Sequence, residues 1–374
     1  MRKYLSCIIL IVACIVCAMI LYVNATSTEP DEEDRDNTEP STDVDAVPEK
    51  KTEIAENGTI MSEYFCASRL RIEWNTIKYE NEPCLYVSAE LFLESPYGIG
   101  KPCTGSLTIN GIRSDFNINQ SSDVVTLLYA SSVEVKDFVN GSIIDISGAI
   151  NLEFVGEGGV SLSSLSASGK IYQSTSQMKQ NAYLSNFEHI SQYPSLPSGD
   201  EITSLAMVLR YLKYNVDPCN LCDLYLDKGP VGFTDFYKAN VGNPRDTYNS
   251  YGCLSPVIVN SANKFISANG GTHKAYDYSG YSVKELYRQV SLGSACIVWI
   301  CDDFGSTPSI SRIWVVDGKT LYLKSNMACM VLIGYDYTKG TVTLANPAGN
   351  TFTLEMSAFE KGFADMGSYA VVVK

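Results

Sequence analysis

Apolar residues follow different patterns in successive parts of the chain, and the first is a continuous run. Residues 4–23 read YLSCIILIVACIVCAMILYV, twenty largely apolar residues without a charge, directly after the basic start MRK. A run of this length can cross a bilayer as a helix, and the positive flank keeps the N-terminus inside. We predict a signal-anchor or signal peptide over residues 1–26, with membrane contact through residues 4–23.

The fate of this segment is left open by the residues themselves. A cleaved signal peptide usually has a shorter apolar core, yet VNA before Thr26 could serve as a cleavage site. IVAC, which ends at Cys14, weakly resembles a lipoprotein signal, although the apolar run continues past it. The expected location is the extracellular face of the cell membrane, or the secreted fraction if the segment is cleaved.

A polar, acidic stretch follows. Residues 27–56 hold 12 acidic and 3 basic residues, a net −9 out of −14 for the whole chain of 374 residues. So few apolar residues cannot offset the entropy of folding, so we predict a disordered acidic linker over residues 27–57 that acts as a tether. The chain has no evident basic patch, which argues against nucleic acid as a partner.

Short apolar runs separated by Gly, Pro, Asn and Ser then dominate residues 58–176. This spacing is typical of an antiparallel β-sandwich-like domain or a barrel. The runs are RLRIEWNTIKY, CLYVSAELFLE, GSLTING, DVVTLLYASSVEV and SIIDISGAINLEF. No acid/base pair, metal cluster or phosphate loop is evident there, so we expect a binding module or a structural spacer.

Helical spacing appears only in the last part, residues 180–374. A helix beginning near residue 200 would place five apolar residues on one face, and Ser282 would introduce a second helix over SVKELYRQV. The five are Ile202, Leu205, Ala206, Leu209 and Leu212. Strand-like runs follow: SACIVWI, KTLYLK, MACMVLIGYD, GTVTLANP and YAVVVK. Helices followed by an antiparallel sheet indicate an α+β domain, and the whole chain is predicted to be multi-domain.

Cysteine usage gives no sign of a cofactor. Nine cysteines follow the N-terminal run, and an odd number means that at least one is free or pairs with another chain. Cys219 and Cys222 form a CNLC pair without a second pair or a nearby His. We interpret this pair as structural rather than as a zinc or redox site, and we predict no cofactor.

One further pattern is a series of short motifs in a fixed order. They are ISQYPSLPSGDEITSLAMVLRYLKYNV, VGNP, SYGCLSPVIVNSANKF, YDYSGYSVKELYRQVSLG, CIVWI, CMVLIGYD, VTLANPAGNTFTL and GSYAVVVK. Over about residues 183–374 this series resembles the C-thirty-nine-like cysteine peptidases, relatives of bacteriocin leader peptidases. The resemblance implies a papain-like fold with a Gln that stabilises an oxyanion, a Cys nucleophile at a helix start, a His base and an orienting Asp or Asn.

Transferring these roles places two substitutions in the site. Gln192 occupies the oxyanion position and Asn346 the orienting position, but Asp200 stands where the Cys belongs and Ala328 where the His belongs. The separation of 128 residues between the two substituted positions fits a Cys-to-His spacing. The resemblance therefore implies an intact frame without a thiolate or a base.

Other residues could in principle replace the lost groups. His189 and His273 are the only histidines, and each is expected to be an ordinary surface or loop residue. Cys329 adjoins the base position, but strand alternation should turn its side chain to the opposite face, and Cys253 is expected to pack in the core. A carboxyl pair could do acid chemistry, with Glu201 and Asp336 as candidate partners of Asp200.

Asp200 also has a purely structural interpretation. Asp accepts bonds from the orphan N–H groups of a helix start and suits the positive end of the helix dipole. Alternatively Ser198 caps the helix and Glu201 completes a capping box. A capping role predicts a lowered pKa for Asp200, whereas a catalytic carboxyl pair predicts a raised one.

Three functional hypotheses follow. The leading one is an exported cell-surface protein whose peptidase-like domain is inactive and binds a peptide or a cell-envelope protein. The second is an active hydrolase with a reorganised site around Asp200 or His189. The third is a scaffold whose β-rich domain holds the ligand site.

Overall fold

The computed structural model describes residues 51–62, 64–155, 161–174, 178–304 and 307–374. The described residues belong to one unit, residues 50–374. Strand β1 (Thr52–Met61) begins inside the stretch predicted as linker, so the predicted boundary at residue 57 falls within a strand. Within the described ranges, no helix has the length and apolar character needed to cross a membrane. The predicted span at residues 4–23 lies outside these ranges.

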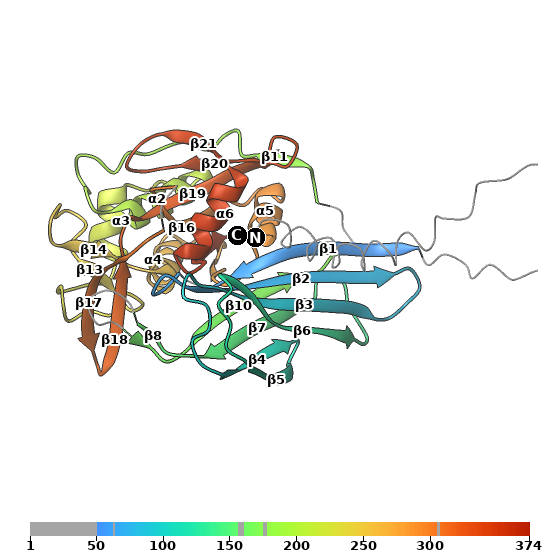
Figure 1. Ribbon diagram of the computed structural model, residues 1–374. Helices are drawn as coiled ribbons and strands as arrows, with labels where there is room; N and C mark the ends of the chain where they lie inside the picture. Colours follow the sequence, from blue (N-terminus) through green and yellow to red (C-terminus); the bar gives the residue numbers. More distant parts are fainter. Residues whose placement is uncertain (1–50, 63, 156–160, 175–177, 305–306) are drawn as a thin grey trace, which may run out of the picture. The chain divides into compact units, whose positions relative to one another are not determined.

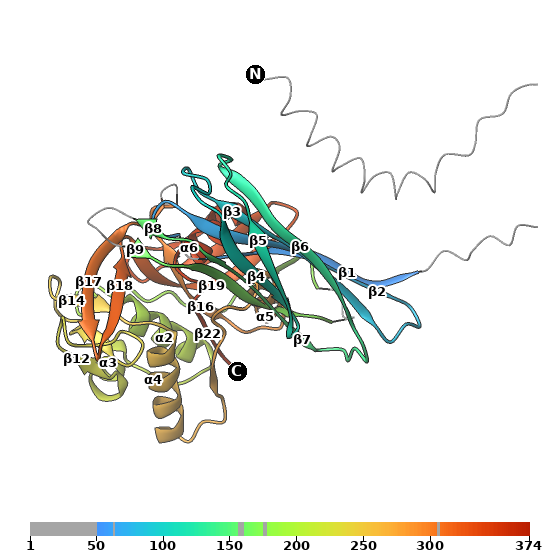
Figure 2. The same ribbon diagram turned by 60° about the horizontal axis from the view of Figure 1, so that its bottom comes forward.

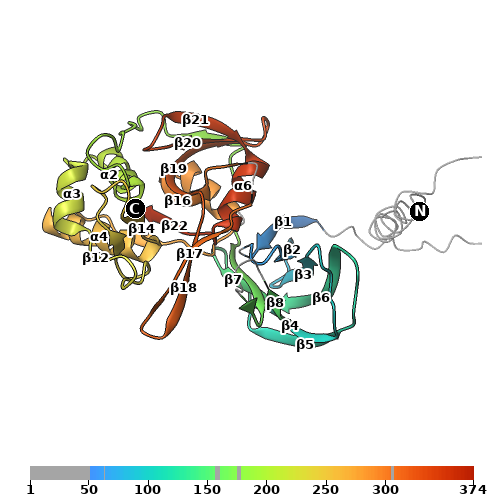
Figure 3. The same cartoon turned by 60° about the vertical axis from the view of Figure 1, so that its left-hand side comes forward.

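The first part of this unit consists of two four-stranded antiparallel sheets (Figures 2 and 3). One has the order β1, β2 (Arg69–Tyr79), β3 (Leu85–Glu94) and β6 (Val125–Val135). The other has the order β10 (Leu165–Tyr172), β7 (Ile143–Asn151), β4 (Cys103–Ile109) and β5 (Ile112–Ile118). Every second residue of β3 from Leu85 to Leu93 is buried, because one face of the strand packs into a core shared by both sheets. Two open sheets over one core form a sandwich, not a barrel.

A larger sheet organises the second part (Figure 1). Its order is β15 (Ala275–Asp277), β22 (Ala370–Val373), β16 (Cys296–Cys301), β19 (Met327–Asp336), β20 (Thr341–Ala345) and β21 (Thr351–Glu355), and β11 (Asn181–Tyr183) also pairs with β19. All of these pairings are antiparallel, as predicted. The helices are α2 (Asp200–Tyr211), α3 (Pro218–Tyr225), α4 (Ser255–Ala268), α5 (Val283–Ser291) and α6 (Met356–Asp365).

Shorter strands complete the structure. They are the three-stranded sheet of β12 (Lys228–Gly229), β13 (Asn240–Gly242) and β14 (Ser250–Gly252), and the pairs β17 (Ile310–Val316) with β18 (Lys319–Lys324) and β8 (Phe154–Val155) with β9 (Ser161–Leu162).

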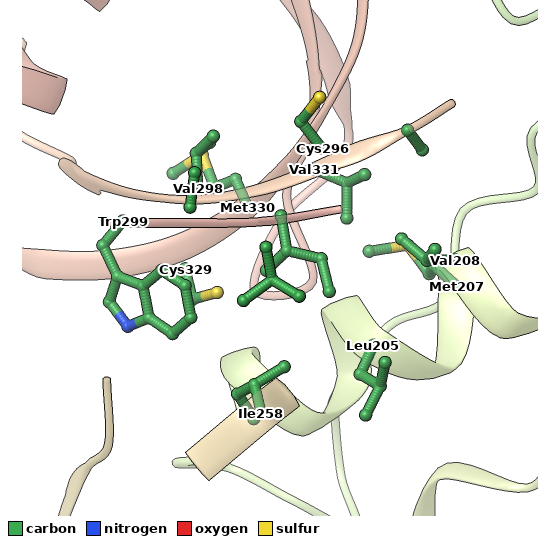
Figure 4. Packing of buried hydrophobic residues seen from close by; sticks show 14 of the residues in the cluster. Leu205, Met207, Val208, Ile258, Cys296, Val298, Trp299, Cys329, Met330 and Val331 are labelled. Carbon is green, nitrogen blue, oxygen red and sulfur yellow. The ribbon is translucent and has the colours of Figure 1, made fainter. Parts of the chain in front are cut away.

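Helix α2 lies in the core of this second part. Its side chains Leu205, Met207 and Val208 are buried with Val298 of β16 and Val331 of β19 (Figure 4). Burial extends from Glu201 to Leu209 without interruption, because the sheet lies on one side of α2 and helices α3 and α4 contact it as well. The helix is therefore buried all round, whereas its sequence indicated an amphipathic helix.

Candidate functional site

The loop before α2 turns tightly into the helix. Gly199 is the N-cap residue, and no side chain caps the helix. A Cβ at position 199 would lie 2.9 Å from the Cβ of Leu196 and 3.1 Å from that of Pro244, so only glycine fits there without displacement. The Ser198 hydroxyl donates instead to the main-chain oxygen of Asp246 at 2.9 Å. The predictions that Asp200 or Ser198 caps the helix, and that Glu201 completes a capping box, are therefore wrong.

Asp200 connects the start of α2 to strand β19. Its Oδ2 accepts the main-chain N–H of Cys329 at 2.6 Å. That N–H belongs to the residue directly after Ala328, so the structure brings the predicted nucleophile and base positions together. Ala328 is half-buried, whereas the side chain of Cys329 is buried in the core. Seven consecutive residues of β19, from Cys329 to Tyr335, are buried, so burial does not separate the two faces of the strand and the expected alternation stays a prediction.

Glu201, the residue after Asp200, is enclosed by the segment around Cys253. Its Oε1 accepts the main-chain N–H of Cys253 at 3.0 Å, and its Oε2 has no hydrogen-bond partner among the described residues. Gly252 has a φ of +74°, and a Cβ there would lie 2.0 Å from Oε1 of Glu201. The glycine before Cys253 thus makes room for a buried carboxyl group.

Burial raises the pKa of both carboxyl groups. For Asp200 burial is the largest cause, opposed by the bond from Cys329, and Asp302 adds a repulsive negative charge. For Glu201 burial comes first and the charge of Asp200 second, which raises its pKa well above the usual range. The raised direction contradicts the lowered pKa that a capping role predicts, because desolvation outweighs the favourable bonds.

The two nearby thiols are poor nucleophiles. Cys253 and Cys329 are buried, and burial followed by the negative charges of Asp200 and Glu201 raises both thiol pKa values well above the usual range. A thiolate is the reactive form of cysteine. Neither thiol is therefore placed to replace the Cys that the family resemblance implies at position 200.

The oxyanion and orienting positions lie on two segments that are bonded together. The main-chain N–H of Gln192 donates to the oxygen of Pro347 at 2.9 Å, and its side-chain Nε2 donates to the oxygen of Pro197 at 2.8 Å. The Oε1 of Gln192 is buried without a partner in the described structure. Asn346 uses its Oδ1 to accept the N–H of Ala348 at 2.9 Å, within its own turn.

His189 belongs to the same pair of segments. Its Nε2 lies 2.7 Å from the main-chain oxygen of Asn346, and since that oxygen can only accept, Nε2 carries the proton. The sequence assigned His189 to a turn. The structure places this half-buried ring beside the orienting position, with one nitrogen engaged by the backbone.

Other candidate residues lie outside this arrangement. His273 bonds through Nδ1 to the hydroxyl of Tyr214 at 2.9 Å. Asp336 accepts the N–H groups of Thr338 and Lys339, and it is seven residues beyond Cys329 on β19, about 23 Å at about 3.3 Å per residue. Of the two carboxyl partners considered for Asp200, only Glu201 is adjacent to it. The CNLC thiols are free; Cys222 is buried and Cys219 half-buried in α3.

A cavity of about 240 Å³ opens near Met327, the first residue of β19. Its lining is mainly apolar and aromatic, with Leu254 after the Glu201-bonded Cys253 and Met327 before Ala328, and with Tyr322 and Tyr369 at its side. Sequence reasoning missed this cavity and the charge of Asp302. The register that pairs Cys301 with Met327 brings these residues close, and a single sequence does not specify register.

The described residues include no group of three or more His, Cys, Asp or Glu side chains that could hold a metal ion. What the geometry offers is the half-buried carboxyl group of Asp200 at the start of α2 and an apolar cavity near Met327, at the start of β19. Such an arrangement can bind polar and apolar groups of a ligand together.

The start of α2 lies beside strand β19, as the resemblance to papain-like peptidases implies. Residues 184–371, half of the chain, match the model of the Peptidase_C39 like family. The chain belongs to this family.

The chain is also similar to individual proteins. The uncharacterized protein YvpB of Bacillus subtilis (strain 168) is 28% identical over 186 residues, which covers 48% of this chain and 71% of YvpB. The crystal structure of a protein described as a C39-like peptidase from Bacillus anthracis is 27% identical, with a TM-score of 0.46, and covers 52% of this chain and 98% of its own. Xylellain, a cysteine protease from Xylella fastidiosa, is 11% identical with a TM-score of 0.30, over 53% of this chain and 87% of its own.

Proposed function

We propose that this protein is exported and that its C39-like domain binds peptide segments, or an extended segment of an envelope protein, without cleaving them. The observation that carries the proposal is the contact at the start of α2. The carboxylate at the nucleophile position accepts a backbone N–H from β19, beside an alanine at the base position. Without a base and a thiolate, no group is left to attack a peptide carbonyl.

The cavity beside Met327 supports the binding half of the proposal. Peptide-binding sites combine an apolar pocket for a side chain with polar groups that fix the backbone. The cavity supplies the apolar surface, and the half-buried Asp200 lies at the start of α2. We therefore expect peptides with an apolar side chain to be preferred.

Binding and cleavage can be tested in one experiment. The full chain is immobilised and exposed to a diverse peptide library, and both the retained and the released peptides are analysed by mass spectrometry. We expect selective retention and no new termini. Met327→Glu should reduce retention at least tenfold, because it puts a charge into the apolar cavity.

The matched control is Met356→Glu, the same change at another half-buried methionine, which does not line the cavity. This control should retain peptides as the unaltered protein does. Equal retention by the two variants would contradict the proposed binding site.

A second function, hydrolysis by a carboxyl pair, is favoured by one observation, the raised pKa of Asp200 and Glu201. Against it, Glu201 is enclosed by Gly252 and Cys253, which leaves it no open face toward a substrate. This alternative requires cleavage that depends on pH and is abolished by both Asp200→Asn and Glu201→Gln.

A further inference from the structure

A second cavity of about 240 Å³ lies between β1 and β2 on one side and α5 and α6 on the other. None of its lining residues belongs to the site around Asp200. Ile60, Val283 and Phe363 contribute apolar walls. Two charged side chains, Lys284 and Glu360, and the indole of Trp74 also line the cavity, together with several hydroxyl-bearing residues.

Lys284 contributes a positive charge. Its side chain is half-buried, and its Nζ donates to the main-chain oxygen of Asn57. The ammonium lies 5.6 Å from the ring centre of Trp74, and it forms no ion pair among the residues that the structure describes. Burial lowers the pKa of Lys284, against the opposing influence of Glu56 and Glu360.

Trp74 contributes its aromatic ring. Its side chain is only 3% exposed, and its indole N–H has no acceptor in the described part of the chain. Gly58 lies directly against the ring, since a Cβ there would be 2.6 Å from Cζ2. The N–H itself is buried, so Trp74 lines the cavity with its ring and not with its donor.

Glu360 contributes a negative charge from α6. The hydroxyl of Tyr287 donates to its Oε1 at 3.1 Å, and burial raises the pKa of this carboxyl group despite the attraction of Lys284. Glu360 and Lys284 thus line one cavity with opposite charges that are not in contact. A molecule that carries both charges would complement them.

We propose that this cavity binds a free α-amino acid with an apolar side chain. The carboxylate of the ligand contacts the Lys284 ammonium, and the ligand ammonium contacts Glu360. The ligand side chain packs against Ile60, Val283 and Phe363. The cavity volume corresponds to about eight water molecules at about 30 Å³ each, which suits a small amino acid and is below the usual range for drug-sized ligands.

Calorimetric titration of the full chain with three related probes tests this. Leucine carries both charges, leucinamide only the ammonium, and 4-methylpentanoate only the carboxylate. We expect leucine to bind at least tenfold more tightly than either analogue, because each analogue leaves one half-buried charge of the cavity without a partner. Leucine should also raise the unfolding temperature, since it binds only the folded state.

Variants assign the effect to the cavity. Lys284→Gln and Glu360→Gln should each weaken leucine binding at least tenfold, whereas Lys339→Gln, at an exposed lysine, should leave it unchanged. If a variant fails to fold, the comparison of the three probes on the unaltered chain still tests whether the site requires both charges of the ligand. The proposal is overturned if leucine, methionine and phenylalanine all fail to bind, if the analogues bind as well as leucine, or if a folded Lys284→Gln variant binds leucine normally.

Discussion

Glu201 shows how a single residue changes the electrostatics of the site. Its pKa in the folded protein lies well above the usual value of a glutamate, about 4.5, so the folded state retains a proton that the unfolded chain releases. Stability from this group is complete below about pH 4.5 and is lost as the pH rises toward the raised pKa. The Glu201→Gln variant cannot release this proton. It should therefore be more stable than the unaltered protein at about pH 8, and this advantage should be smaller at about pH 4, as measured by urea unfolding of both proteins at both values.

Asp336→Asn is a control in which the pH dependence of stability should change in the opposite direction. Lys339 lowers the pKa of Asp336 below 3.8, so its small contribution is lost as the pH falls. Parallel pH profiles for the unaltered protein and Glu201→Gln would contradict the buried carboxyl pair.

Gly252 gives a second test at the residue scale. Gly252→Ala and Gly232→Ala both place a side chain at positive φ, +74° and +82°, but only the first meets an obstacle, Oε1 of Glu201. The shared backbone strain costs roughly 1–2 kcal/mol, and the overlap at 252 should add about 1–3 kcal/mol. Chemical denaturation of both variants measures the difference, and equal losses would mean that Glu201 moves away easily.

Sequence reasoning at this scale located the site but not its bonds. The motif order placed Gln192, Asp200, Ala328 and Asn346 in one region, and the structure brings Asp200 to within a hydrogen bond of the residue after Ala328. The bond to Cys329 and the raised pKa were missed, because both depend on distances and burial that helix-capping rules do not include. His189 was considered as a possible base, but its bond to the main chain of Asn346 could not be predicted for the same reason.

Among the elements, helix α2 shows what apolar periodicity can predict. The predicted range and core face agree with Asp200–Tyr211, and four of the five predicted face residues are buried, but Leu212 is half-exposed just after the helix. Burial of Thr203 and Ser204 on the other side was not predicted, because the packing of α3 and α4 against α2 leaves no mark in its own sequence.

This contrast yields a prediction for α2. Leu205→Ala should destabilise the protein by about 2–5 kcal/mol, because it opens a cavity in the core where Leu205 is packed (Figure 4). Leu212→Ala should cost less than about 1 kcal/mol at its half-exposed position. Thermal unfolding of the two variants compares them, and similar losses would contradict the packing of α2.

Strands were predicted best where apolar residues alternate or cluster. The run RLRIEWNTIKY coincides with β2, and MACMVLIGYD with β19. Strand β5, IRSDFNI, was missed because it lies at a sheet edge and most of its residues are exposed or half-exposed. Strand β1 was missed in part because its polar residues continue the acidic composition of the preceding stretch.

At the scale of the whole molecule, the described chain has two hydrophobic cores, one in the sandwich strands and one around α2 and the large sheet. The second core coincides with the family match over residues 184–371. The fold could be anticipated in this region because eight short motifs occur in order. The sandwich could be anticipated only as a class, because alternating strands do not specify how sheets pair.

The central claim is that the C39-like domain binds peptides without cleaving them, and peptide turnover by the full chain tests it most directly. Cleavage of a diverse peptide library is measured for the unaltered protein, for Asp200→Ala and for the double variant Asp200→Cys with Ala328→His, which reinstates a thiol and an imidazole. We predict no turnover by the first two and measurable, thiol-dependent turnover by the double variant. Turnover by the unaltered protein that disappears in Asp200→Ala would contradict the account.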